Sequence, residues 1–235
     1  MSAGIRPSGR KIMPDPVSSS APLATRILLG GGGSEEDERP IFDRFAAWVG
    51  GGRVLYLPIA ADQPGSSHLA WVTSVLGPLG VGHIDMWTTL AGHQPAELGS
   101  YAGVFIGGGN TYWLLHQLRA GGFGDAIRQF ALGGGVVYGG SAGAIVLGAN
   151  ISTCAHMDHN DVGITDMHGL DLLDGHAVWC HYQAADFPLT QVFVRRTRLP
   201  TYLLAETTGL WRRGPADFVS IGWPAAYLLS DGMVA

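Results

Sequence analysis

The motif GGSAG at residues 139–143 contains the residue types that a serine nucleophile requires. An apolar run precedes it and a helix-compatible apolar run follows. A serine at a sharp strand-to-helix turn exposes its hydroxyl group, and small neighbours allow the turn to close. The N–H groups at the start of the helix favour developing negative charge. The pattern predicts Ser141 as the nucleophile of an acyl transfer; the alternatives are an ordinary glycine-rich turn and a phosphate-binding loop.

A second glycine run, GGGNT at residues 107–111, also follows an apolar run. If the two apolar runs are neighbouring parallel strands, this loop lies beside Ser141. The backbone N–H of Gly109 or Asn110, together with that of Ala142, is then expected to form an oxyanion hole. The alternative is that Asn110 caps the helix that follows, and both roles can hold at once because they use different groups.

A nucleophilic serine needs a base, and nine histidines compete for that role. His181 stands out because it follows the short apolar run at 177–180, which places it at the carboxyl end of a strand. Two acids could orient it. Glu206 ends the apolar run at 202–205, whereas Asp161 lies in a polar loop. From spacing alone, other roles remain open: capping or surface positions for the histidines, a solvated strand end for Glu206 and a turn for Asp161.

The elements that must position these residues alternate along the chain. Short apolar runs end in glycine clusters, and amphipathic segments follow, which is typical of βαβ units with helices on both faces of a parallel sheet. We expect an α/β three-layer sandwich with a mostly parallel central sheet. Strands are predicted at 26–29, 54–59, 82–87, 104–106, 136–138, 177–180, 202–205, 218–221 and 226–229. Helices are predicted at 34–49, with Ser34 as its N-cap, and at 66–79, 112–118, 125–132 and 142–147. We expect a disordered leader at 1–25 and one catalytic domain at 26–235.

Composition excludes several classes of protein. Hydrophobic residues make up 46% of the chain and charged residues only 14%, which excludes a charge-rich disordered protein. The net charge is −5 and Lys11 is the only lysine, so nucleic-acid binding through a basic face is not expected. No apolar run approaches a membrane span. The two cysteines suit free thiols in a reducing cytoplasm. The sequence leaves homo-oligomerisation open.

Neither a metal nor a cofactor is expected. Cysteine, histidine and aspartate recur between residues 154 and 168, but their spacing matches neither of the common zinc patterns. No lysine follows a glycine-rich loop, which excludes a nucleotide-binding P-loop. The glycines at 30–33 lie at the same predicted strand-end rim, without an assigned catalytic role.

Four segments together resemble the peptidase E family and the related cyanophycinases, which are serine hydrolases. They are GGGNTYWLL at 107–115, GGSAGA at 139–144, NDVGITDMHGLDLL at 160–173 and HYQAADFP at 181–188. The resemblance covers about residues 26–230 and implies a class-I glutamine amidotransferase-like fold. It also implies that Ser141 is the nucleophile and His181 the base.

The resemblance leaves two choices for the third member of the triad. In the peptidase E branch an aspartate in the segment resembling 160–161 has that role; in the cyanophycinase-like branch it is a glutamate in the segment resembling Glu206. This chain has both Asp161 and Glu206. We favour Glu206, because a strand end is better fixed than a glycine- and histidine-rich loop. Asp161 then becomes a substrate-binding residue.

The expected function is therefore that of a serine peptidase acting on short peptides through a Ser-His-Glu triad and an acyl-enzyme. The resemblance implies a dipeptidase with a preference for N-terminal aspartate, which would need a cation for the side chain and an anion for the free amine. None of the five arginines between 195 and 213 is placed in the site by sequence. The alternatives are a cyanophycinase-like hydrolase or amidase on the same fold, and a non-catalytic module that binds a small ligand or anion.

Overall fold

The computed structural model describes residues 25–215 and 217–231. The expected disorder of the leader falls on residues 1–24, outside the described part. The helices are α1 (Arg39–Val49), α2 (Ser66–Leu76), α3 (Thr111–Ala120), α4 (Phe123–Leu132), α5 (Ala142–Leu147) and α6 (Phe187–Thr197). The strands are β1 (Arg26–Gly30), β2 (Val54–Leu57), β3 (Ile84–Met86), β4 (Gly103–Ile106), β5 (Val136–Gly140), β6 (Ala177–Trp179), β7 (Thr201–Leu203), β8 (Thr208–Gly214), β9 (Asp217–Gly222) and β10 (Tyr227–Leu229).

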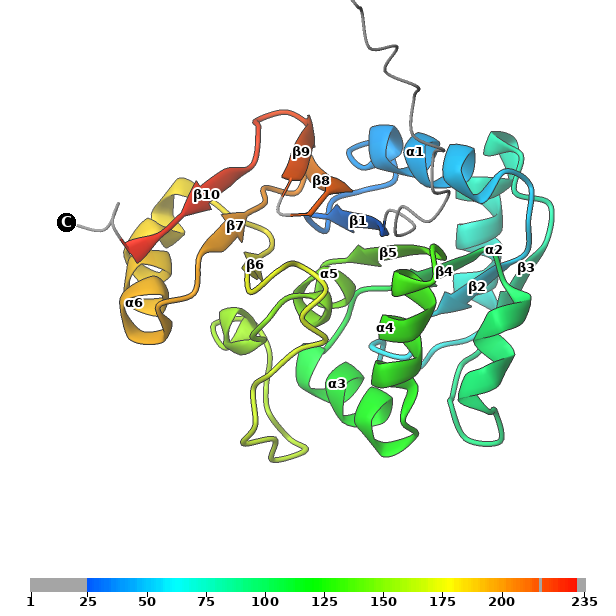
Figure 1. Ribbon diagram of the computed structural model, residues 1–235, viewed down its shortest axis with the longest axis horizontal. Coiled ribbons are helices and arrows are strands. Elements are labelled where there is room, and N and C mark those ends of the chain that lie inside the picture. Colours follow the sequence, from blue (N-terminus) through cyan, green and yellow to red (C-terminus); the bar gives the residue numbers. More distant parts are fainter. Residues whose placement is uncertain (1–24, 216, 232–235) are drawn as a thin grey trace, which may run out of the picture.

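A mixed sheet with the order β3-β2-β4-β5-β1-β8-β9 forms the centre of the molecule (Figure 1). Its first five strands are parallel, and β8 and β9 add an antiparallel hairpin at one edge. The predicted mostly parallel α/β sheet is confirmed. Because β4 and β5 are neighbours, the loops that follow them meet at one edge, as the sequence predicted.

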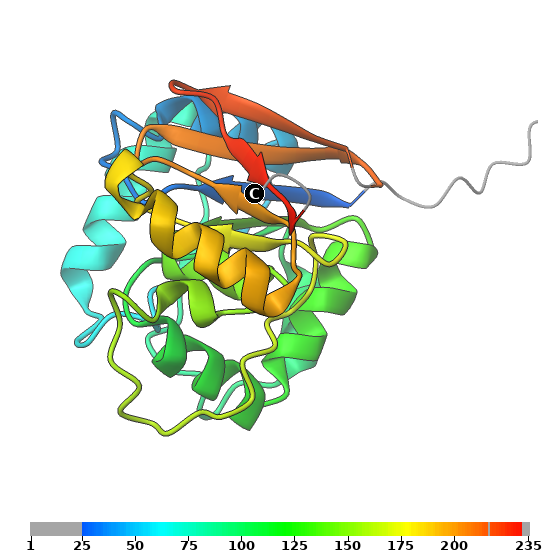
Figure 2. The same ribbon diagram turned by 90° about the vertical axis from the view of Figure 1, so that its left-hand side faces the viewer.

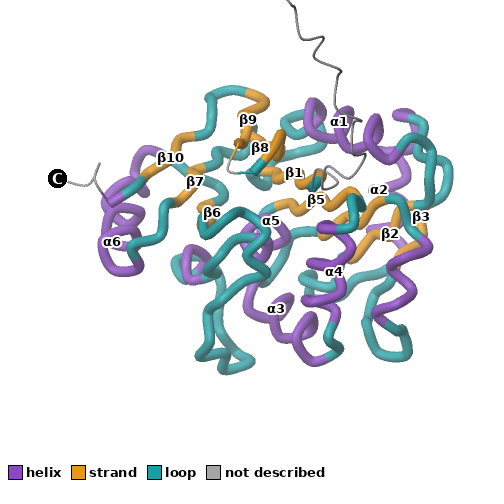
Figure 3. Tube along the Cα trace, viewed as in Figure 1, coloured by secondary structure: helices purple, strands orange, loops and turns teal. Residues whose placement is uncertain are grey.

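Helices cover both faces of this sheet. Alternate side chains of each strand point to opposite faces. One set packs with α1 and α2 around Phe42, Phe45 and Val72. The other set packs with α3, α4 and α5 around Leu114, Ile127 and Ile145. Figures 1 and 3 show α1 on one side of the sheet and α3 and α4 on the other. The two cores hold the strand ends, and the loops between them, in fixed positions.

A smaller sheet, with the order β10-β7-β6, lies beside the large one. Strands β6 and β7 are parallel, and α6 lies in front of this sheet in the turned view (Figure 2). His181 and Glu206 follow β6 and β7, so this sheet positions both of them. No helix in the described ranges is long and apolar enough to cross a bilayer.

One local prediction was wrong, and two elements, β8 and α6, were not predicted. Helix α1 begins at Arg39, not at Ser34, because Ser34 Oγ and Asp37 Oδ2 hydrogen-bond at 2.7 Å in a separate turn and Pro40 suits the first helical turn. Strand β8 was not predicted, since its two arginines and two glycines mask the apolar pattern of an edge hairpin. None of these three differences moves a candidate site residue.

Candidate active site

Ser141 lies in the sharp turn between β5 and α5, with φ 51° and ψ −113°. Its N–H donates to the carbonyl of Gly30 at 3.2 Å, which ties the turn to the end of β1. A Cβ on Gly139 would lie 2.3 Å from the Gly143 carbonyl oxygen, and a Cβ on Gly143 would lie 2.4 Å from that of Ile106. The small residues of the motif are therefore a steric requirement of the turn. A non-glycine residue at this φ and ψ is strained, as nucleophilic residues commonly are.

His181 reaches Ser141 from the smaller sheet. It follows β6 and buried Cys180, and its N–H donates to the Gly31 carbonyl at 3.0 Å. Its Nε2 lies 2.9 Å from Ser141 Oγ. Its Nδ1 lies 3.0 Å from Glu206 Oε1. With the proton on Nδ1, the ring accepts from the serine hydroxyl and donates to the carboxylate.

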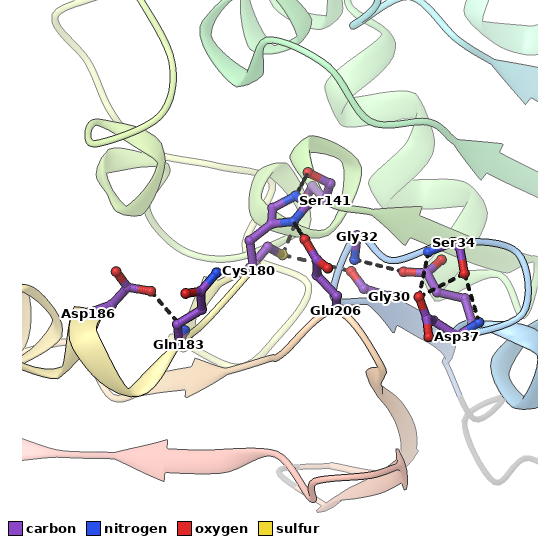
Figure 4. A network of polar contacts seen from close by, with 11 residues as sticks. Gly30, Gly32, Ser34, Asp37, Ser141, Cys180, Gln183, Asp186 and Glu206 are labelled. Carbon is purple, nitrogen blue, oxygen red and sulfur yellow. Dashed lines mark hydrogen bonds and ion pairs between the residues drawn. The ribbon is translucent and has the colours of Figure 1, made fainter.

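Figure 4 shows Ser141, Gly32 and Glu206 gathered where α5, the chain after β1 and the chain after β7 meet. The side chain of His181 is 29% exposed and that of Glu206 is 58% exposed. Of the two acids that the sequence offered as orienting groups, the structure brings Glu206 to the imidazole. Asp161 lies elsewhere, in a hollow next to the loop that follows β4.

The loop at 107–111 packs directly against Ser141. A Cβ on Gly108 would lie 3.2 Å from Ser141 Cβ and 3.7 Å from its Oγ. Gly109 has φ 136°, and a Cβ there would lie 2.2 Å from the Ala60 carbonyl oxygen. Gly108 was not singled out from the sequence, although it belongs to the glycine run that was.

Asn110 corrects one part of the oxyanion-hole prediction. Its backbone N–H donates to the Ala60 carbonyl at 2.9 Å, so this amide is already committed. Its side chain accepts from Trp113 N at 2.9 Å and donates to the His159 carbonyl at 2.8 Å. Asn110 is thus the N-cap of α3 and an anchor for the loop beyond it. Among the hydrogen bonds of the described residues, none uses the N–H of Gly109 or Ala142.

A hollow of about 570 Å³ adjoins the same loop. Its lining includes Gly109, Trp113, Asp62 and Asp161, and no lysine or arginine is among the described lining residues. Trp113 is 42% exposed, so an aromatic surface is available there. Gly109 lines this hollow and the adjacent Gly108 packs against Ser141, so the loop at 107–111 adjoins both.

Side chains of the polar segment at 154–168 form hydrogen bonds and ion pairs within the protein. Asp158 Oδ2 accepts from the N–H of Thr111 at 2.8 Å at the start of α3. Asp166 pairs with His168 at 2.6 Å and with Arg119 at 3.1 Å. Within the ranges that the structure describes, no group of three metal-ligating side chains comes together. Burial raises the pKa of the Cys154 thiol to about 12, and it raises the pKa of Cys180 as well.

The glycines at 30–33 form part of the site. A Cβ on Gly32 would lie 2.4 Å from His181 Cε1 and 3.0 Å from Ser141 Cβ. A Cβ on Gly31 would lie 1.9 Å from the Ala205 carbonyl oxygen, and a Cβ on Gly33 would lie 2.5 Å from that of Glu206. The clustering of glycine at a strand end was the available signal, but sequence alone did not show what the loop approaches.

Glu38 is a further residue that sequence reasoning missed. It is only 6% exposed, and its Oε1 accepts from the N–H of Gly32 at 2.8 Å. Its other oxygen accepts a hydrogen bond from the Tyr138 hydroxyl. Burial raises the pKa of this carboxyl group, against the opposing effect of its hydrogen-bond donors and of His181.

The sheet topology, the strained serine and the serine–histidine contact define the class of α/β serine hydrolases. Residues 26–216 match the model of peptidase family S51, and the chain belongs to this family. It is a peptidase of the peptidase E type.

Relatives from several bacteria carry peptidase names. An uncharacterized peptidase of Listeria monocytogenes is 28% identical over 167 residues, which span 68% of this chain and 81% of the relative. Peptidase E of a Shewanella species is 34% identical over 138 residues, or 54% of this chain and 56% of that protein. Peptidase E of Escherichia coli is 33% identical over 124 residues, or 51% and 50%. The chain thus spans about half the length of these two peptidase E proteins.

Two solved structures share the fold. One is a Listeria monocytogenes protein provisionally named peptidase E, with a TM-score of 0.69, 22% identity, and coverage of 85% of this chain and 98% of the other. The second is a peptidase from an acI-B1 Actinobacterium, with a TM-score of 0.67, 16% identity, and coverage of 89% and 92%. At these identities the likeness concerns the fold.

Proposed function

We propose that this chain hydrolyses short peptides with a free N-terminus, as a dipeptidase, through an acyl-enzyme on Ser141. The observation that carries the proposal is the continuous contact from Ser141 Oγ to His181 Nε2 at 2.9 Å and from Nδ1 to Glu206 at 3.0 Å. Such a chain of contacts activates a hydroxyl group that is otherwise a weak nucleophile.

In the proposed reaction, His181 takes the proton of Ser141 as Oγ attacks the peptide carbonyl carbon. The N–H groups of Gly109 and Ala142 stabilise the oxyanion, and Glu206 holds the ring tautomer and stabilises the imidazolium. His181 then gives the proton to the leaving amine. Water, activated by the same ring, hydrolyses the ester and restores the serine.

Asp161 is proposed to bind the substrate amine. Its support is its place in the hollow beside Gly109, where Asp62 supplies a second carboxylate. An ammonium group is the partner that two carboxylates favour. A preference for N-terminal aspartate stays a prediction, for which the described lining offers no arginine or lysine.

A panel of dipeptides tests this function. Asp-Leu, Ala-Leu and Lys-Leu are compared with their N-acetylated forms, using wild-type protein and Ser141→Ala. We expect hydrolysis of free dipeptides, a large loss on acetylation and no turnover by the variant. Cleavage of acetylated peptides at the same rate would instead favour an amidase. Absence of all hydrolysis, together with ligand binding, would favour a non-catalytic module.

A further inference from the structure

Glu38 is a buried carboxylate, and none of the ion pairs found among the described residues involves it. It precedes α1, whose N-terminus favours negative charge. Its two oxygens accept from Gly32 N–H and the Tyr138 hydroxyl, which is the bonding pattern of an ionised carboxylate. The backbone N–H of Gly33 also favours the charged form. A charge with 6% exposure is costly, so its retention calls for a physical reason.

The peptide that Glu38 holds is the one that packs against the catalytic groups. Gly32 lies so close to His181 and Ser141 that a Cβ there would approach the two side chains to 2.4 and 3.0 Å. The adjacent Gly31 carbonyl accepts from His181 N–H at 3.0 Å. Movement of this loop would therefore change the position of the imidazole relative to Ser141 Oγ.

Titratable groups from four parts of the fold lie around the imidazole. Glu206 follows β7 and is more than half exposed, so solvent weakens its attraction for an imidazolium. Glu38 approaches from before α1 and is buried. Tyr138 on β5 and Cys180 after β6 remain neutral, because burial raises the pKa of both groups. When His181 carries a positive charge, that charge favours the ionised form of Glu38.

We propose that Glu38 is a positioning residue for the Ser141–His181 contact. Its carboxylate holds the Gly32 peptide against the imidazole and supplies a buried negative charge in addition to the exposed charge of Glu206. This inference rests on the proposed roles of Ser141 and His181. The charge stabilises the imidazolium that forms when Ser141 loses its proton, in both halves of the reaction.

Glu38→Gln tests the role of the charge with little change in shape. The amide oxygen can still accept from Gly32 N–H, and the amide N–H can donate to the Tyr138 hydroxyl. The readout is the rate at which a fluorophosphonate labels Ser141 across a range of pH, which needs no peptide substrate. We expect labelling to slow by about tenfold and the acid limb of the profile to move down by about half a pH unit, as loss of one nearby charge at intermediate dielectric implies.

Glu36→Gln is the matched control, because it removes the same charge from the exposed surface of the same turn. It is expected to match the wild-type rate and profile. Tyr138→Phe keeps the carboxylate and removes one donor, so we expect a loss of about threefold, the size of one weakened hydrogen bond. If Glu38→Gln does not fold, the labelling rate of Tyr138→Phe tests the proposed role of Glu38 instead.

The melting temperature of Glu38→Gln distinguishes a positioning role of Glu38 from a merely structural one. The fold raises the pKa of Glu38, so the stability it contributes is full below the ordinary carboxyl pKa and is lost as pH rises through the raised value. Glutamine is neutral at every pH, so Glu38→Gln should melt at the same or a higher temperature than wild type at pH 8. The proposal would be overturned if Glu38→Gln were labelled more slowly but melted at a lower temperature and kept the wild-type acid limb of the pH profile. An unchanged labelling rate in Glu38→Gln would also overturn it. Failure of the dipeptide panel alone would remove the peptidase proposal and leave this one standing.

Discussion

The contact between Ser141 and His181 and the hollow that contains Asp161 differ in how tightly the surrounding residues pack. Around Ser141, backbone atoms of glycine loops approach so closely that Gly31, Gly32 and Gly139 have no room for a Cβ. Around Asp161, most of the lining is exposed, and it comes from the connection after β2, from the loop before α3 and the first turn of that helix, and from the long connection between α5 and β6. The first region fixes the atoms of Ser141 and His181, whereas Asp161 in the second region lies apart from them. Substitutions in the first should therefore lower kcat, and those in the second should raise KM.

Gly32→Ala should have the largest effect among the substitutions that test this comparison. A Cβ at 2.4 Å from the His181 ring forces the loop or the imidazole to move, and φ 97° disfavours any side chain. We expect kcat/KM to fall by about 10²-fold, the scale of a 1 Å displacement of a catalytic group.

Gly51→Ala is the control for Gly32→Ala. Gly51 has φ 81° but open space around its Cβ position. We expect a loss of about 1 kcal/mol of stability from the backbone strain and an unchanged kcat/KM. Equal loss of activity in both variants, measured on folded protein, would show that close packing at Gly32 is irrelevant.

Glu206→Gln should have the next largest effect. The amide can still accept from Nδ1–H, but the charge that stabilises the imidazolium is gone. Because the carboxylate is 58% exposed, we expect a fall in kcat of about tenfold to thirtyfold, well below the loss seen for buried triad acids. Steady-state kinetics on the best dipeptide measures it, and an unchanged kcat would remove Glu206 from the proposed triad.

Asp161→Asn removes one charge from the hollow, as Glu206→Gln does from the catalytic contact. If Asp161 binds the substrate amine, KM should rise by about fivefold while kcat changes less than twofold, in line with a partly exposed ion pair. A collapse of kcat with KM unchanged would make Asp161 the orienting acid and contradict the division between the two regions.

The buried thiols should show the smallest effect. Burial raises the pKa of Cys154 to about 12 and raises that of Cys180 further, so little thiolate exists at pH 8. Iodoacetamide should label neither cysteine in the native protein and both in denaturant, with activity unchanged after native treatment. Rapid native labelling of Cys180, which lies beside His181, would show that the catalytic contact opens to solvent.

Local patterns were sufficient to predict the elbow at Ser141 and the strand ends before His181 and Glu206. Glycine clusters and short apolar runs report backbone geometry that is set within a few residues. The role of Gly32 and the position of Glu38 depend on contacts of the segment after β1 with β5 and with the residues that follow β5 and β6, at separations of 100 residues or more. Strand β8 was missed for a related reason, since an edge hairpin is stabilised by its partners more than by its own pattern.

The prediction for Asn110 shows the same limit. An asparagine after a strand can cap a helix with its side chain and still offer its N–H to a ligand. Only the position of Ala60, contributed by the connection after β2, reveals that this N–H is already used. The oxyanion proposal consequently narrows to Gly109 and Ala142.

The most direct test of the account is covalent labelling of the nucleophile. Wild-type protein and the variants Ser141→Ala and His181→Ala are treated with a fluorophosphonate, and the modified residue is located by mass spectrometry. The account predicts one adduct, on Ser141, which is absent in the first variant and at least 10²-fold slower to form in the second. An adduct on another residue, or peptide hydrolysis that persists in Ser141→Ala, would contradict it.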